Sequence, residues 1–385
     1  MRSTFCSLVS LLALGLTQAV HAEASCDFDN VQFRDDFEAA RLAGCRQRGM
    51  LEFELGVAPE DAPINPSAWY AFAIDARERM ELTITLVYSH GRHRYTPKLR
   101  LPQGDWQRVE PIKIAADGSR ASFAVRVPAG RSYIASQPLT GTAELGAWLT
   151  THVRDRRGLY LYDIGTSEQG RPLSAFRTRA SRREYIVLLG RQHPPETTGA
   201  DGLFVFAERL LADDALARRF RQRFGILVVP LLNPDGVVHG QWRNNSRGVD
   251  INRDWGPFTQ AETRAARDVL AEIARARRSK LALLLDFHST DRDVLYTQPD
   301  DFGGSRAWFP SAWQRAIEQK LGSRLARDAS HNPASPTAKT WVATTYSVPA
   351  ITVEFGDETT PENVRRLAKA AAESAMQLLL DGANQ

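Results

Sequence analysis

An apolar run without alternation, YIVLL at residues 185–189, limits most strongly what this 385-residue chain can fold into. Such a run is typical of a strand buried on both faces of a parallel or mixed sheet. Gly190 follows it, and HPPE stands shortly after at residues 193–196. Ligands collect at the carboxyl ends of strands in sheets of this kind, so we expect His193 to lie at a binding site.

The HPPE segment can bind a metal only through the shape of its turn. The two prolines prevent a continuous helix, so helical spacing cannot bring His193 and Glu196 together. A His-x-x-Glu pair is common by chance, and a solvated loop is the alternative interpretation. A third ligand is available in a second apolar run, residues 281–287, which ends in His288 just past its strand. Two histidines and one glutamate form the ligand set of a catalytic zinc, with a fourth position for water.

Two further groups of polar residues follow or interrupt predicted strands. The segment between Arg243 and Arg253 also holds Asn252. Arginine and asparagine together can bind a carboxylate through bidentate and single hydrogen bonds. Glu354 stands inside the apolar segment 350–355, where a lone carboxylate is costly unless it has a partner or a task. The role of general base beside a metal is such a task.

The pattern of elements predicts two domains. Residues 23–150 carry β-rich, alternating stretches and are expected to form a small all-β sandwich. Its His90 and His93 stand in an Arg-rich loop and are expected to face solvent. Residues 151–385 predict an α/β fold with a mixed, mostly parallel sheet covered by helices on both faces. The expected elements of this second domain are helices at 203–211, 260–278, 311–329 and 361–380, strands at 224–232, 281–287 and 350–355, and a turn at 233–236.

The first 22 residues have the basic start and short apolar core of a secretory signal peptide. The apolar run is too short to span a bilayer and no lipobox precedes Cys26, so we predict export without a membrane anchor. The protein is expected in the periplasm or outside the cell. After removal of Cys6 with the signal, Cys26 and Cys45 are expected to form a disulfide, with two free thiols as the alternative.

The charges along the chain are mixed and do not indicate a particular class of partner. The formal net charge is +4, and 45 acidic residues are interspersed among 49 basic ones. No basic stripe with interleaved aromatic residues is found, so we predict no nucleic-acid partner. The mild basic excess is compatible with acidic substrates.

Five motifs, taken in order, resemble the zinc carboxypeptidase family and most closely its cytosolic-type, deglutamylase-like branch. They are HPPE at 193–196, NPDG at 233–236 with Arg243, GVDINR at 248–253, DFH at 286–288 and TVE at 352–354. The resemblance covers about residues 150–380. Stretches in the first domain also look like the β-domain of that branch: AWYAF at 68–72, YTPK at 95–98 and GDW at 104–106.

The resemblance implies one zinc ion per chain, held by His193, Glu196 and His288. If His288 were not the third ligand, His331 would be the next candidate. Asp250 would orient an imidazole, that of His193, and so sharpen metal affinity.

The resemblance also implies a catalytic apparatus for peptides. Glu354 would take a proton from the attacking water and deliver it to the leaving amine. Arg243 would stabilise the oxyanion together with zinc. Asn252 and Arg253 would bind the free C-terminal carboxylate of a peptide substrate, which predicts a metallocarboxypeptidase.

The identity of a substrate-capping tyrosine and the type of reaction each have alternatives. The tyrosine that closes over the substrate in pancreatic-type enzymes has no clear counterpart; Tyr296 and Tyr346 are candidates, with packing as the alternative for both. A zinc-dependent deacylase of N-acylated amino acids is an alternative function, although the β-domain and the NPDG turn favour the peptidase. A non-catalytic binding protein would be marked by a lost ligand or base, and none is missing.

Overall fold

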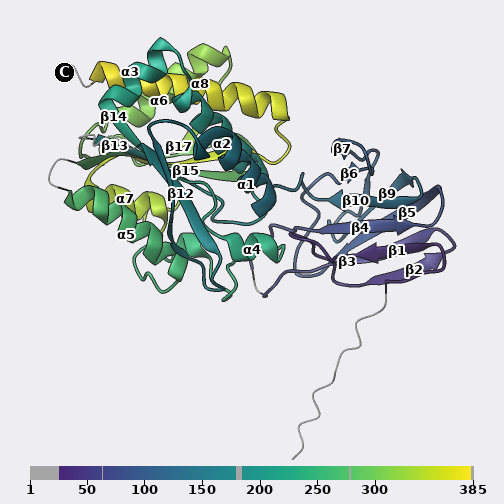
Figure 1. Ribbon diagram of the computed structural model, residues 1–385. Helices are drawn as coiled ribbons and strands as arrows, with labels where there is room; N and C mark the ends of the chain where they lie inside the picture. The colour runs from purple at the N-terminus through teal and green to yellow at the C-terminus, as the bar shows by residue number, and fades with distance from the viewer. Residues whose placement is uncertain (1–25, 63, 179–183, 277–278, 383–385) are drawn as a thin grey trace, which may run out of the picture.

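The chain forms two lobes. The computed structural model describes residues 26–62, 64–178, 184–276 and 279–382. One lobe is built from the N-terminal strands, and a larger lobe of strands and helices holds the C-terminal part (Figure 1). The expected signal peptide, residues 1–22, lies outside the described residues. Within the described ranges, no helix is both long and apolar enough to cross a membrane.

The smaller lobe, called the β-domain below, contains two five-stranded sheets. Buried and more exposed side chains alternate along its longest strand, which is the pattern of a strand with one face in a core. The first sheet has the order β1 (Val31–Arg34), β4 (Ala71–Ala76), β10 (Gly130–Ala135), β6 (Lys98–Arg100) and β7 (Gln107–Arg108). The second has the order β2 (Cys45–Gly49), β3 (Glu52–Val57), β5 (Met80–Tyr88), β9 (Arg120–Val127) and β8 (Lys113–Ile114). One apolar cluster joins both sheets, as expected of a sandwich.

The larger lobe is organised around an eight-stranded mixed sheet. Its central strands β14, β13, β15 and β18 are mutually parallel, and the strands toward both edges include antiparallel pairs. The sheet order is β11 (Leu159–Thr166), β12 (Pro172–Thr178), β14 (Phe224–Val229), β13 (Glu184–Gly190), β15 (Lys280–Thr290), β18 (Ala350–Gly356), β16 (Val294–Tyr296) and β17 (Ala326–Asp328).

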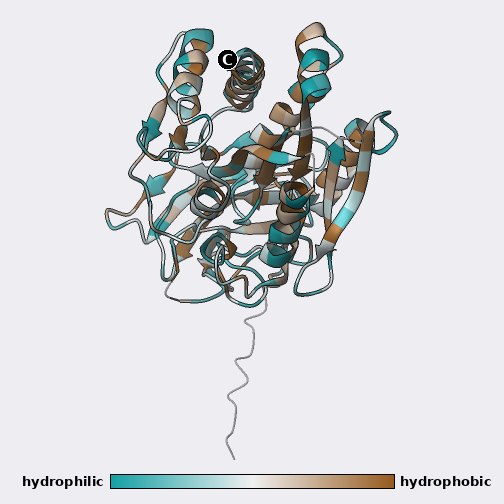
Figure 2. Ribbon diagram, turned by 90° about the vertical axis from the view of Figure 1, so that its left-hand side faces the viewer, coloured by the Kyte–Doolittle hydropathy of each residue, from teal (hydrophilic) through white to brown (hydrophobic). Residues whose placement is uncertain are grey.

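Helices cover both faces of this sheet, as the sequence predicts. On β13, Ile186 and Leu188 pack against one helical layer, and Val187 and Leu189 against the other. The first layer contains α1 (Thr142–Leu149), α2 (Thr197–Leu211), α3 (Ala215–Arg223), α6 (Phe309–Leu321) and α8 (Pro361–Gly382), and the second α5 (Ala261–Arg275) and α7 (Ala338–Tyr346). Hydrophobic residues gather on the strands between the layers (Figure 2). Short helical segments complete the lobe: η1 (Thr150–Arg154), α4 (Pro234–Val238) and η2 (Ile251–Arg253).

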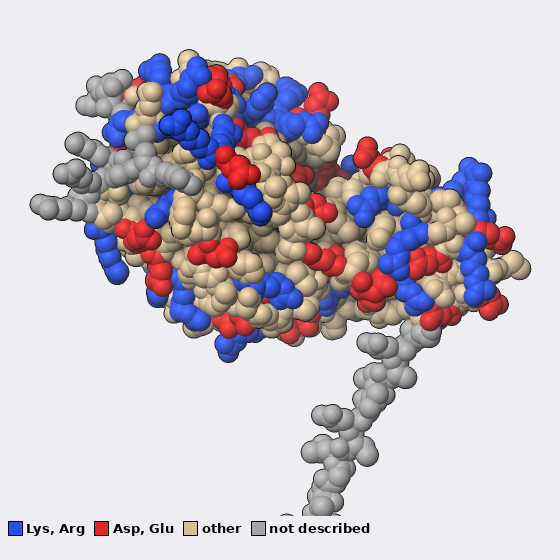
Figure 3. Space-filling view, in the orientation of Figure 1, with Lys and Arg blue, Asp and Glu red and all other residues tan. Residues whose placement is uncertain are grey.

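The surface shows charges of both signs. On the face drawn in Figure 3, Lys and Arg side chains are mixed with Asp and Glu over both lobes. Such mixing is typical of an ordinary solvated surface.

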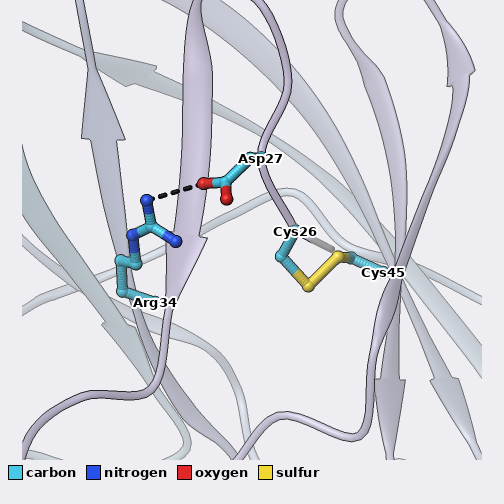
Figure 4. The surroundings of a disulfide bond; sticks show 4 residues. All are labelled: Cys26, Asp27, Arg34 and Cys45. Atoms are coloured by element: carbon cyan, nitrogen blue, oxygen red, sulfur yellow. Dashed lines mark ion pairs between the residues drawn. A yellow bond between two sulfur atoms is a disulfide. The ribbon is translucent and has the colours of Figure 1, made fainter. Parts of the chain in front are cut away.

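A disulfide joins Cys26 to Cys45, with 5.6 Å between their Cα atoms (Figure 4). It ties the first described residue to β2, and the neighbouring Asp27 forms an ion pair with Arg34 of β1. The disulfide expected from the two remaining cysteines is therefore present. Because a cross-link reduces the freedom of the unfolded chain, it adds stability to this small lobe.

Several predicted boundaries need correction. The helix predicted at 311–329 ends at Leu321, because Gly322 adopts a left-handed conformation with φ of 69°. The chain then enters β17. The strand predicted at 281–287 runs on to Thr290, so His288 lies inside the strand and not just past it. The strand predicted to reach residue 232 ends at Val229.

Two predictions about loops are also corrected. The segment 233–236 is not a simple turn: Asn233 caps the short helix α4 by accepting a hydrogen bond from the Gly236 N–H. His93 is partly buried, with Nδ1 3.0 Å from the Tyr88 hydroxyl, whereas His90 is exposed as expected.

The predicted domain boundary at residue 150 falls after α1, yet α1 packs in the core of the larger lobe.

Candidate active site

The three predicted metal ligands meet at the carboxyl end of the sheet. Nδ1 of His193 lies 2.8 Å from Oε1 of Glu196, and Nδ1 of His288 lies 2.7 Å from Oε2 of the same carboxylate. The two Nδ1 atoms are 3.2 Å apart. All three side chains are buried, and their ligand atoms converge on one point.

Each imidazole is oriented by a carboxylate behind it. Nε2 of His193 lies 3.1 Å from Asp250, and Nε2 of His288 lies 2.9 Å from Asp286. With a cation bound, these carboxylates would hold the ring proton on Nε2, and Nδ1 would offer its lone pair to the shared centre. Two imidazole nitrogens and one carboxylate, all buried and converging, are the donor set of a catalytic zinc site. The residues present therefore fit a zinc ion.

The turn that carries His193 is held by its neighbours. Arg191, itself buried with φ of 54°, donates from Nε and Nη2 to the carbonyl oxygen of Pro194, at 3.0 and 2.7 Å. Asn233 donates from Nδ2 to the carbonyl oxygens of Gln192 and Asn244, at 3.1 and 3.0 Å. Asn233 thus joins the metal-binding turn to the loop that contains Arg243.

Glu354 stands next to the metal ligands because of the strand register. In the parallel pair β15–β18, Glu354 is the registered neighbour of His288. Its Oε2 is buried, and among the described residues it has no hydrogen-bond partner. Burial raises the pKa of Glu354 to about 8; the His288 charge opposes this shift, and the Glu196 charge adds to it. A bound divalent cation would lower this pKa.

The charges of the site alternate around the shared centre. Burial disfavours ionised Glu196, but His193 and His288 hold the pKa of its carboxyl well below the usual range. Burial likewise disfavours charged His288, but Asp286 and Glu196 raise its pKa well above the ordinary value. The pKa of Asp250 is lowered by His193 and Arg243 despite its burial. The neighbouring cationic groups therefore keep the Glu196 and Asp250 carboxylates ionised, whereas the carboxyl group of Glu354 is shifted the other way.

The residues predicted to bind substrate line the same cavity, which has a volume of about 220 Å³. Arg243 donates from Nε to Asp250 at 2.7 Å, so the carboxylate that orients His193 also orients this arginine. Arg253 donates to the carbonyl oxygen of Asn252 at 2.8 Å. Asn252 accepts the Ala338 N–H through Oδ1, which leaves its Nδ2 beside Nε2 of His288.

The candidate tyrosines differ in position. Tyr296 lines the cavity, and its ring stacks on His331 with centroids 3.9 Å apart. His331 also lines the cavity but lies outside the converging ligand group. Tyr346 packs edge-on against Trp341 and is not among the residues that line the cavity.

Residues 147–375 match the zinc carboxypeptidase family, which is more than half of the chain. The chain belongs to the zinc carboxypeptidase family. Among curated relatives, mouse cytosolic carboxypeptidase 3 is 36% identical over 104 residues, which is 27% of this chain and 10% of that protein. Mouse cytosolic carboxypeptidase 6 is 20% identical over 288 residues, 66% of this chain and 52% of that protein. The chain thus spans about a tenth to a half of the length of these relatives.

Solved structures of bacterial metallo-carboxypeptidases align over both lobes of this chain. A metallo-carboxypeptidase from Burkholderia cenocepacia has a TM-score of 0.79 and 18% identity, covering 91% of this chain and 100% of its own. A metallo-carboxypeptidase from Pseudomonas aeruginosa, solved in complex with (2-guanidinoethylmercapto)succinic acid, has a TM-score of 0.76 and 20% identity, covering 91% and 99%. The β-domain is therefore part of a fold that recurs among bacterial metallo-carboxypeptidases.

Three residues around the site of this member of the zinc carboxypeptidase family were not predicted from the sequence. Asp286 could have been found, because it stands two residues before His288 on a strand and must share its face. Gln192 donates a hydrogen bond to Asp286 at 2.7 Å and accepts one from Trp255. It therefore holds in place the carboxylate that orients His288. Lys339 lines the cavity from α7, and no pattern in the sequence distinguished it from a surface lysine.

Proposed function

We propose that this protein is a zinc-dependent carboxypeptidase that removes C-terminal residues from peptides. One observation carries the proposal: a converging His-Glu-His group, an adjacent buried carboxylate and two arginines all border one cavity. A zinc ion bound by His193, Glu196 and His288 would activate water and polarise the scissile carbonyl.

The chain's own residues then divide the work of hydrolysis. Glu354 accepts a proton from the attacking water and returns it to the leaving amine, a role suited to a pKa raised by burial. Arg243 donates hydrogen bonds to the scissile carbonyl oxygen as negative charge develops on it. Arg253 and the Nδ2 amide group of Asn252 bind the terminal carboxylate of the peptide.

Lys339 supports a preference for an acidic terminal side chain. It is only 4% exposed, its Nζ donates to the carbonyl oxygen of His331 at 2.9 Å, and it lines the cavity. Burial lowers the pKa of Lys339 to about 8. A carboxylate beside it would favour the charged ammonium group, so an acidic side chain gains an ion pair and a basic one is repelled.

The proposal includes an exported protein. The signal-like residues 1–22 and the disulfide between Cys26 and Cys45 both support an oxidising compartment, the periplasm or the exterior.

Release of C-terminal residues from free peptides, followed by mass spectrometry with and without a chelator, tests the function. We expect stepwise shortening that stops with chelator and returns with added zinc. Activity that is indifferent to prolonged chelation and to zinc would contradict the metal-dependent mechanism.

Lys339→Met tests the substrate preference, because it removes the charge and keeps a long apolar side chain. We expect kcat/KM for a peptide ending in glutamate to fall about 10- to 100-fold, the loss of one charge-assisted bond, and that for a peptide ending in leucine to hold or rise. An equal fall for both peptides would show that Lys339 serves only the structure.

A further inference from the structure

The β-domain supplies one wall of the cavity that holds the metal-binding group. Asn65, Ser67 and Arg94 line it together with His193 and Glu196. They come from segments that connect strands of the β-domain, about a hundred residues or more before the metal ligands in the chain. This wall has no part in the hydrolysis described above.

Arg94 is held firmly in this wall. It donates from Nε to Asp357 at 2.8 Å and from Nη1 to the hydroxyl of Ser67 at 3.1 Å. Ser67 is 3% exposed, and the Arg94 side chain is 24% exposed. Within the described part of the chain, Nη2 of Arg94 has no hydrogen-bond partner. Two of the three guanidinium nitrogens are therefore anchored, and Nη2, at the free edge, is available to a ligand in the cavity.

The cations of the cavity fall into two groups. Arg94 is hydrogen-bonded to Asp357, which directly follows β18. Arg243 is hydrogen-bonded to Asp250, close to Arg253 in the chain, and Lys339 to the carbonyl oxygen of His331. Arg94 is thus held by other partners than the residues assigned to the terminal carboxylate and side chain. A peptide whose C-terminal residue binds at Arg253 and Lys339 must place its preceding residues along another part of the cavity wall.

We propose that Arg94 binds the substrate's peptide chain on the amino side of the scissile bond, so that the β-domain forms part of the active site. This inference rests on the proposed carboxypeptidase function. The ligand chemistry is that of a peptide backbone: the free edge of the guanidinium donates to a main-chain carbonyl oxygen upstream of the residue that carries the scissile carbonyl.

The consequence is a dependence on substrate length. A short acylated substrate ends before it reaches Arg94 and gains nothing from it, whereas a longer peptide gains a hydrogen bond to a charged donor. Such a bond, made in a partly desolvated cavity, changes binding by about 10- to 100-fold. A site with this wall is therefore suited to peptides more than to N-acylated single amino acids.

The test compares a dipeptide without an N-terminal acyl group with an acetylated pentapeptide that has the same two C-terminal residues, because an acetyl group on the dipeptide would itself offer the upstream carbonyl. For Arg94→Ala we expect kcat/KM to fall about 10- to 100-fold on the pentapeptide and less than about threefold on the dipeptide. Arg126→Ala is the matched control: Arg126 lies on β9 of the same domain, is 74% exposed and, among the described residues, pairs only with Glu81 at the surface. Its activity should equal that of the wild type on both substrates.

Two outcomes would overturn the inference. An equal loss on both substrates would show that Arg94 acts on the reaction centre through Asp357, and an unchanged pentapeptide rate would show that it binds nothing. If Arg94→Ala fails to fold, Arg94→Gln is judged by the same two rates, because glutamine can still donate to Asp357 but lacks the free cationic edge. A wild type that shortens neither substrate would instead contradict the proposed function, so the two failures are distinguishable.

Discussion

At the scale of single residues, the site works because carboxylates stand behind the groups that react. Asp250 serves two functions at once, since it orients both His193 and Arg243. Asp286 orients the imidazole of His288 and accepts a hydrogen bond from Gln192. Supports of this kind fix ring orientation and ligand basicity, so their loss weakens the site without removing a ligand.

Glu354 is the residue whose role is tested most cleanly. Replacing Glu354 by glutamine keeps its volume and removes the base, so we expect kcat to fall about 10²–10⁴-fold. Zinc content and KM should change little, because Glu354 is not one of the converging ligands. Residue release and elemental analysis measure both quantities, with the exposed Glu81→Gln as a control. A loss of zinc in parallel with activity would contradict the role of base.

The sequence predicts the metal group and Glu354 because each lies in or directly after an apolar strand, where a polar residue needs a function. It does not predict Lys339 or Arg94, because their significance depends on cavity neighbours far away in the chain, whereas Asp286 could have been found beside His288. Arg94, for example, meets Asp357 across 263 positions. Local patterns carry no information on such pairings.

At the scale of elements, one contact between the lobes supports the loop of Arg243. The Glu60 carboxylate of the β-domain accepts the backbone N–H groups of Trp242, Arg243 and Asn244, at 2.7, 3.0 and 2.9 Å. Three successive donors on one carboxylate fix the path of the loop. The same scale explains the helix that ends early at Leu321, since the left-handed Gly322 redirects the chain into β17.

Glu60 is therefore a positioning residue for Arg243. Glu60→Ala leaves three backbone donors without their partner, and we expect a loss of about 1–3 kcal/mol of stability. We also expect a fall in kcat with unchanged zinc content. Glu60→Gln keeps one acceptor oxygen and should recover part of the activity. Denaturation curves and kinetics check both; if Glu60→Ala lost stability but kept full kcat per folded molecule, Glu60 would only join the lobes.

At the scale of the whole molecule, two lobes with separate cores share one cavity. The overall α/β architecture and the sandwich are both predicted from the sequence, because strand burial and alternation are local signals. The way in which the lobes meet is not predicted, because it depends on single side chains. Trp242, for example, belongs to a loop of the larger lobe but packs in the core of the β-domain.

The disulfide tests the stability of the smaller lobe. Cys26→Ser with Cys45→Ser should lower the free energy of unfolding by about 2–4 kcal/mol, because the unfolded chain gains freedom. Activity of the folded protein should be unchanged, since neither cysteine lines the cavity. Denaturant unfolding measures the first quantity. Alkylation of two thiols in native exported protein would contradict the presence of the bond.

The cavity is proposed to recognise a free peptide C-terminus beside a hydrolytic metal site. The most direct measurement compares one peptide as the free acid and as the C-terminal amide, with the zinc-loaded wild type. If Arg253 and Asn252 bind a carboxylate as proposed, the amide should react at least about 10- to 100-fold more slowly, in kcat/KM. Equal cleavage of acid and amide would contradict the account and point to an internal amide bond or to deacylation.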